Sequence, residues 1–176
     1  MTHPETSTGT APPSQPAEPS EAVEQTWLAE TVRLATDSVA AGGGPFGALI
    51  ARAGEVVATG TNQVTVSPDP TAHAEVVAIR RAAEQLGDFR LDGCVLVTSC
   101  EPCPLCLAAS LWARVDRVVY GADRHDAAAV GFDDREFYEL FSQPVATWPT
   151  SVQQLAIPER TAPFAAWETK TDRVDY

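Results

Sequence analysis

Two short stretches of the chain carry residues whose types and spacing suit metal chemistry. The first reads His73-Ala74-Glu75, and the second reads Pro102-Cys103-Pro104-Leu105-Cys106. Imidazole nitrogen and thiolate sulfur bind Zn²⁺ in a tetrahedral shell, and a catalytic zinc keeps three protein ligands and leaves the fourth position to water. His73, Cys103 and Cys106 can supply those three ligands. The sequence therefore predicts a catalytic Zn²⁺ site.

The cysteines taken alone are compatible with other sites. Cys103 and Cys106 could form a redox pair or half of a structural zinc site, and Cys100 extends them to the Cys-x-x-Cys-x-x-Cys spacing of an iron–sulfur motif. Adding Cys94 would give a structural zinc ion held by four thiolates. The upstream His-x-Glu favours the catalytic zinc over these alternatives. Cys100 is then expected to bind no metal.

The combination of His-x-Glu with a later Pro-Cys-x-x-Cys resembles the signature of zinc-dependent nucleobase deaminases. In hydrolytic deamination the attacking water loses a proton and the leaving amine gains one. Glu75 stands two residues after His73, so its carboxylate can lie beside the zinc-bound water without binding the metal. We expect Glu75 to shuttle the proton as the catalytic acid and base.

Two helix starts are expected to position these residues. Thr71 is a plausible N-cap for a helix that runs to about Leu86, and a second helix is expected from near Cys103 to Trp112. The N-terminus of a helix presents unpaired N–H groups and the positive end of its dipole. Both features favour thiolate over thiol, so two converging helix starts suit a zinc site.

The remaining elements alternate between strands and helices, which indicates an α/β fold. The expected elements are a helix over 24–39 that stops before glycines 42–44, a hairpin over 46–51 and 55–60, a buried strand over 94–98, a strand over 115–120, a loop over 121–131, a short helix after Asp133-Asp134, one more short strand within 145–157, and a helix that begins within 162–167.

Length and composition limit the domain organisation. The 176 residues suit one domain. Residues 1–22 are rich in Pro, Ser, Thr and Glu, which predicts a disordered N-terminal tail before a deaminase domain over 23–176. Neither a signal peptide nor an apolar run of membrane-spanning length is evident, so we expect a cytoplasmic protein that binds no membrane.

Charge and cysteine placement limit the partners. The formal net charge of −12 disfavours binding to phosphate backbones, so nucleic acid is not expected as a partner. The four cysteines lie within residues 94–106, which suits a metal site in a reducing compartment better than a disulfide framework.

Motifs outside the zinc signature carry a closer resemblance, over residues 28–176, to bacterial guanine deaminases of the cytidine deaminase superfamily. Those motifs are Gly44-Pro45-Phe46-Gly47-Ala48, Asp69-Pro70-Thr71-Ala72-His73-Ala74-Glu75-Val76, Thr98-Ser99-Cys100-Glu101-Pro102-Cys103-Pro104, Trp112-Ala113-Arg114, Asp126-Ala127-Ala128, Gly131-Phe132-Asp133-Asp134 and the terminal Tyr176. The Gly-Phe-Asp-Asp run and the terminal tyrosine are more specific to the guanine branch than the zinc signature is.

The resemblance implies a fold, an assembly and a set of pocket residues. The fold is a three-layer α/β/α sandwich with a five-stranded mixed sheet, and the assembly is a homodimer that exchanges C-terminal segments. Phe46 and Phe132 would offer aromatic faces to the base, and the pocket would also be lined by Asn62, the backbone of Ala74, Asp134 and Tyr176. By residue type alone, Asn62 is typical of a turn and Asp134 of a helix cap. The chain departs from the family pattern at Arg124, for which the resemblance implies no role, and over residues 145–160.

The implied activity is hydrolytic deamination of guanine to xanthine and ammonia, in which Asp134 is expected to help carry a proton to the leaving ammonia. The alternatives are the same chemistry on an aminotriazine, isocytosine, cytosine or guanosine, although a pocket closed by Tyr176 disfavours a ribose. A tRNA adenosine deaminase is opposed by the negative charge. A structural zinc or iron–sulfur interaction module would have four protein ligands and no turnover.

Overall fold

The computed structural model describes residues 19–175. Most of the predicted tail over residues 1–22 lies outside this range, and the first helix already begins at Glu21. Tyr176 also lies outside the described residues.

The helices and strands follow one another in the order expected for an α/β chain. They are α1 (Glu21–Ala40), β1 (Gly47–Arg52), β2 (Glu55–Thr61), α2 (Ala74–Leu86), β3 (Cys94–Cys100), α3 (Pro104–Trp112), β4 (Arg117–Ala122), α4 (Arg124–Ala129), α5 (Arg135–Phe141), the 3₁₀ turn η1 (Val145–Thr147) and α6 (Ala162–Thr169).

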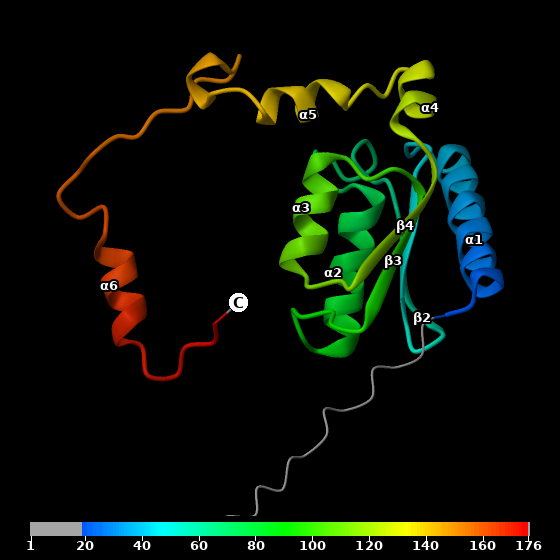
Figure 1. The fold of residues 1–176 in the computed structure, drawn as a ribbon, viewed down its shortest axis with the longest axis horizontal. Helices are drawn as coiled ribbons and strands as arrows, with labels where there is room; N and C mark the ends of the chain where they lie inside the picture. The colour runs from blue at the N-terminus through cyan, green and yellow to red at the C-terminus, as the bar shows by residue number, and fades with distance from the viewer. Residues whose placement is uncertain (1–18, 176) are drawn as a thin grey trace, which may run out of the picture.

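The strands form one mixed sheet in the order β2-β1-β3-β4. Strand β1 is antiparallel to both β2 and β3, and β4 runs parallel to β3. Figure 1 shows α1 on one face of the sheet and α2 with α3 on the other. The predicted three-layer α/β/α sandwich is therefore confirmed.

Glycines allow the helices to approach the sheet closely. A side chain at Gly47 would lie 2.4 Å from the backbone oxygen of Thr31 in α1, and one at Gly60 would lie 2.2 Å from that of Ala74 in α2. Only glycine permits such contacts. The start of α2, next to His73 and Glu75, is thus held directly against β2.

Three local expectations are wrong. The N-cap of α2 is His73 rather than Thr71. Residues 121–131 are not a loop throughout, because the Asp123 carboxylate accepts hydrogen bonds from the backbone of His125 and Asp126 and starts α4. The described part of the sheet has four strands rather than five. The segment expected to add the fifth, within 145–157, contains η1 and otherwise runs without strand pairing.

The chain after α5 leaves the body of the molecule as an arm, residues 143–175, which carries α6 at a distance from the sheet (Figure 1). Large apolar side chains of the arm are exposed: Leu155 by 87%, Phe164 by 69% and Val174 by 63%. The missing strand follows from this path, because a segment that points away from β4 cannot pair with it. None of the helices over residues 19–175 has the length and apolar character needed to cross a membrane.

Candidate active site and metal centre

Two helix starts converge at one end of the sheet, as the sequence predicts. His73 is the N-cap residue of α2, and Cys103 is the N-cap residue of α3, with Cys106 in the first turn that follows. Thr71 does not cap α2 because its N–H and hydroxyl both donate to Asp69 Oδ1, at 2.8 and 2.7 Å. This turn ends the preceding loop and delivers His73 to the helix start.

The three predicted ligands form a compact group. Nδ1 of His73 lies 3.5 Å from Sγ of Cys103 and 3.5 Å from Sγ of Cys106, and the two sulfurs are 3.6 Å apart. Zn–S and Zn–N bonds of about 2.3 and 2.0 Å in a tetrahedral shell require ligand separations of about 3.5–3.8 Å. The donor atoms therefore fit a zinc ion. Over residues 19–175 the group has three members, which leaves a position open.

The electrostatics of the ligand group favour a metal-binding thiolate. The hydrogen bond that joins the sulfur atoms of Cys103 and Cys106, aided by His73, lowers the pKa of Cys103 to about 4. The hydrogen bond with Cys103 raises the pKa of His73. Thiolate is the form of cysteine that binds zinc, so Cys103 is prepared for this role.

The remaining two cysteines stand apart from the ligand group. Sγ of Cys100 lies 3.7 Å from the carbonyl oxygen of Asp123, and burial raises the pKa of this thiol to about 11. Cys94 occupies the opposite end of β3. This arrangement agrees with a site of three ligands and does not support one held by four cysteines.

Glu75 is buried beside the ligands. Its Oε1 lies 3.3 Å from the hydroxyl of Thr98, and its Oε2 lies 3.3 Å from Sγ of Cys106. Burial raises the pKa of this carboxyl group above its ordinary value. A carboxyl group whose pKa lies above its ordinary value takes up a proton more readily, which suits a group that must accept and then release one.

A cavity of about 780 Å³ opens above the ligand group. Its wall includes the loop before β1, the residues that follow β2 and the segment that leads into α5. The predicted residues that line it are Phe46, Asn62, His73, Glu75, Cys103, Phe132 and Asp134. The rings of Phe46 and Phe132 meet edge to face, with centroids 4.9 Å apart. Ala74 is fully buried and contributes no side chain to the wall.

Asn62 is oriented by its own loop. Its Oδ1 accepts a hydrogen bond from the N–H of Val64 at 3.2 Å, so the donor of this side chain is its amide nitrogen, and Asn62 lines the cavity. A side chain at Gly44 would lie 3.1 Å from the Asn62 amide. The glycine loop therefore leaves room for Asn62 beside the cavity.

Asp134 has the position of a helix cap but not its bonding. It is the N-cap residue of α5, yet its side chain makes no capping hydrogen bond. Its Oδ1 is buried and has no hydrogen-bond partner among residues 19–175, and burial raises the pKa of the group. Buried polar atoms are normally paired, so this oxygen points to a ligand that donates a hydrogen bond.

Sequence reasoning missed two contributors to the site. Thr98, which contacts Glu75, is a polar residue within a buried strand, and that contrast was a usable signal. Arg124 hydrogen-bonds to Glu101, directly before Pro102 and Cys103. The two residues are separated by 23 positions, so no local pattern predicts their contact.

Residues 21–122 match the family described as the cytidine and deoxycytidylate deaminase zinc-binding region. The chain is 47% identical over 153 residues to the guanine deaminase of Bacillus subtilis (strain 168), covering 86% of this chain and 98% of that protein. The X-ray structure of guanine deaminase from Bacillus subtilis matches with a TM-score of 0.84 over 86% of this chain and 98% of that one.

More distant relatives match a shorter part of the chain. A structure of guanine deaminase from Nitrosomonas europaea has a TM-score of 0.60 and 35% identity, over 62% of this chain and 64% of that one. A tRNA-specific adenosine deaminase of Haemophilus influenzae is 38% identical over 109 residues, which are 58% of this chain and 63% of that protein.

Proposed function

This chain belongs to the cytidine and deoxycytidylate deaminase family, and from that premise we propose that it hydrolyses guanine to xanthine and ammonia. The proposal rests on one observation: His73, Cys103, the buried Glu75 and Asp134, whose Oδ1 has no partner within residues 19–175, line one cavity, and the third ligand, Cys106, lies directly beneath its wall, 3.6 Å from Cys103. It is supported by 47% identity to a guanine deaminase over most of the chain. The tRNA deaminases match less of the chain, and a net charge of −12 opposes RNA binding.

His73, Cys103 and Cys106 would hold the zinc ion of this family. When bound, zinc lowers the pKa of the water that it binds toward neutrality. The ligand thiols must stay reduced to bind metal, so we infer a reducing compartment, the cytoplasm.

The polar groups of the cavity match the two edges of guanine. The purine presents O6 and N7 as acceptors, and its 2-amino group is a donor on the opposite edge. The amide nitrogen of Asn62 would donate to the acceptor edge, and the carboxylate of Asp134 would accept from the amino group. Phe46 and Phe132 would pack against the base. Adenine has a donor where guanine has O6, so Asn62 would discriminate against it.

Glu75 would move the proton during the reaction. Its carboxylate takes a proton from the attacking water as the water oxygen bonds to the amine-bearing carbon. It delivers this first proton to the ring nitrogen. It then takes the remaining proton from the same oxygen and delivers it to the amine, and the C–N bond breaks with release of ammonia as the C=O bond forms. Thr98 fixes one carboxylate oxygen, and Asp134 accepts a hydrogen bond from the departing nitrogen.

A substrate panel tests the proposed function. The zinc-loaded protein would be given guanine, guanosine, cytosine, isocytosine, an aminotriazine and adenosine-containing tRNA, with ammonia release as the readout. We expect guanine to have the highest kcat/KM. A higher kcat/KM for another compound of the panel would replace the assignment to guanine.

We also propose that the arm, residues 143–175, is exchanged between two copies of the chain. Exposed apolar residues of the arm, the unpaired edge of β4, and Leu111 on α3, which is 71% exposed, support an assembly that covers them. In sedimentation experiments the protein is expected to have twice the mass of one chain. A variant that ends at Ser142 is expected to sediment as a single chain. A dimer that persists without the arm would contradict the exchange.

Removal of Asp175 and Tyr176 is expected to lower guanine turnover by at least about tenfold. We propose that the terminal tyrosine closes the cavity, excludes water and holds the base. Zinc content and Tm should change little. A Tyr176→Phe variant separates the ring from the hydroxyl group. Full activity after removal of both residues would rule out closure by Tyr176.

A further inference from the structure

Arg124, the first residue of α4, is bound on two sides. Its backbone N–H and its Nε donate to Oε2 of Glu101, at 3.0 and 2.9 Å, and its Nη2 donates to Oε1 at 2.5 Å. Its guanidinium carbon lies 3.8 Å from the centroid of the Tyr138 ring on α5. Planar guanidinium groups are suited to such simultaneous bidentate bonding and stacking, and lysine is not.

A further hydrogen bond closes these contacts into a ring. The hydroxyl of Tyr138 donates to the carbonyl oxygen of Pro102 at 2.6 Å, and Pro102 follows Glu101 directly. We call Glu101, Pro102, Arg124 and Tyr138 the Arg124 clamp. The clamp joins the segment just before Cys103 to the start of α4 and to α5.

The clamp ties α5 to the wall of the cavity. Asp134 is the N-cap residue of α5, and Tyr138 follows it by about one helical turn, so both positions move with this helix. Tyr138 is hydrogen-bonded to Pro102, and Asp134 lines the cavity that Cys103 also lines. No capping hydrogen bond holds the Asp134 side chain, and its Oδ1 has no partner within residues 19–175. The placement of this carboxylate therefore depends on the placement of α5.

We propose that Arg124 is a positioning residue that sets α5, through Glu101 and Tyr138, so that the Asp134 carboxylate meets the amino group of the substrate. This inference rests on the proposed deamination of guanine. Misplacement of a reacting group by about 1 Å can cost about 10²-fold in rate. A partly exposed ion pair contributes little to global stability, so loss of the clamp should affect turnover more than unfolding.

The first experiment compares zinc-loaded variants with guanine as substrate. Arg124→Ala is expected to lower kcat/KM by at least about tenfold, with an unchanged zinc content and a fall in Tm of no more than about 4 °C. Arg124→Lys should be only partly active, because an ammonium group neither bridges both carboxylate oxygens nor stacks as a plane. Activity equal to the parent in Arg124→Ala would overturn the inference, as would loss of zinc or a much larger fall in Tm.

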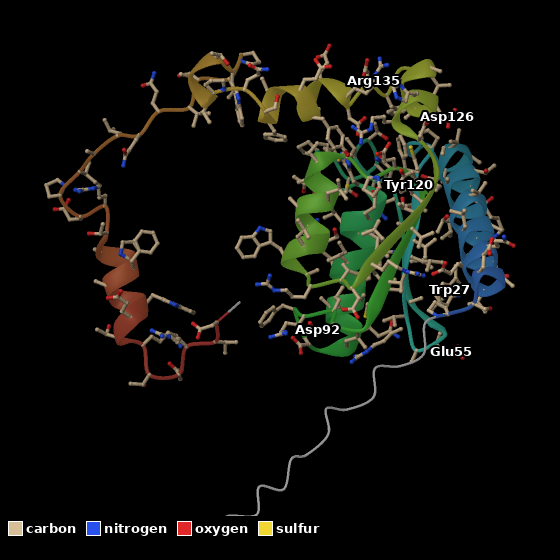
Figure 2. All side chains as sticks on the ribbon, viewed as in Figure 1. Trp27, Glu55, Asp92, Tyr120, Asp126 and Arg135 are labelled. Atoms are coloured by element: carbon tan, nitrogen blue, oxygen red, sulfur yellow. The ribbon has the colours of Figure 1, made fainter. Side chains whose placement is uncertain are left out.

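Arg90 offers a matched control. It also forms a two-point pair with a carboxylate, Nε to Oδ2 of Asp92 at 2.7 Å and Nη2 to Oδ1 at 3.2 Å. Figure 2 shows Asp92 at the end of the body opposite α4 and Arg135 of α5. Arg90→Ala is expected to keep the parent kcat/KM, and a tenfold fall in this variant too would show that the loss in Arg124→Ala is not specific to the clamp.

The second experiment tests whether Arg124 acts through Asp134. In an Asp134→Ala background, Arg124→Ala should change kcat/KM by less than about twofold, because the group that it positions is absent. An equal tenfold fall in both backgrounds would overturn the inference. The Kd of guanine, measured by calorimetry on zinc-loaded Glu75→Gln protein, should rise when Arg124→Ala is added. If the parent does not deaminate guanine, the proposed function fails, and the same double-mutant cycle on the best substrate of the panel still decides the role of Arg124.

Discussion

Replacing Glu75 by glutamine is expected to lower kcat on guanine by about 10³-fold, within the range of about 10²–10⁴ for a general acid–base group. The amide can occupy the same place beside Thr98 but cannot carry a proton at neutral pH. Because Glu75 is not a ligand, zinc content should stay at the parent level. Steady-state kinetics and metal analysis of the same preparation measure both quantities.

Glu55 provides the control for this prediction. It is an exposed glutamate at the start of β2, and Figure 2 shows it at the end of the body away from α4 and α5. Glu55→Gln removes the same charge and should leave kcat unchanged. If Glu75→Gln kept more than about a tenth of the parent activity, Glu75 would not be the proton shuttle.

Loss of a ligand should abolish activity together with the metal. Cys103→Ala removes one of the three donor atoms and is expected to contain little zinc and to show no detectable turnover. Cys100→Ala is the matched control, because Cys100 lies three residues earlier and outside the ligand group. It should keep about one zinc ion per chain.

Metal analysis after dialysis distinguishes the outcomes. Retention of zinc in Cys103→Ala with loss in Cys100→Ala would exchange the roles of the two cysteines. Loss of zinc in both variants would favour a metal site in which Cys100 is also a ligand.

Local sequence patterns predicted the parts of the molecule that depend on local interactions. The hairpin turn at Ala53 and Gly54 has the left-handed backbone of its type, with φ of 51° and 88°. His73 and Cys103 lie at the starts of α2 and α3, as the pattern of apolar residues along the sequence predicts. The helix α4 was missed although its capping box, Asp123 with Asp126, is a local signal.

Other features depend on contacts between residues that are far apart in the sequence, so local sequence patterns do not predict them. The sequence predicts a short strand within residues 145–157, but a strand forms only where a partner edge lies within reach, and the arm leads these residues away from β4. Asp134 is a residue type that commonly caps helices. Only the structure shows that its Oδ1 is buried and that its side chain makes no capping hydrogen bond. Tyr138 and Pro102 are 36 positions apart, so their hydrogen bond could not be read from the chain.

The exposed arm has a consequence for the abundance of the protein. In the proposed exchange of arms, side chains such as Leu155 and Phe164 are covered when two copies meet, whereas a single chain exposes them. Exposed apolar segments of this kind bring a protein to chaperones and proteases, which change its steady-state level. Solitary chains are therefore expected to be degraded faster than assembled ones. The amount of enzyme in a cell would then rise more steeply than its rate of synthesis, since encounters between copies increase with the square of their concentration.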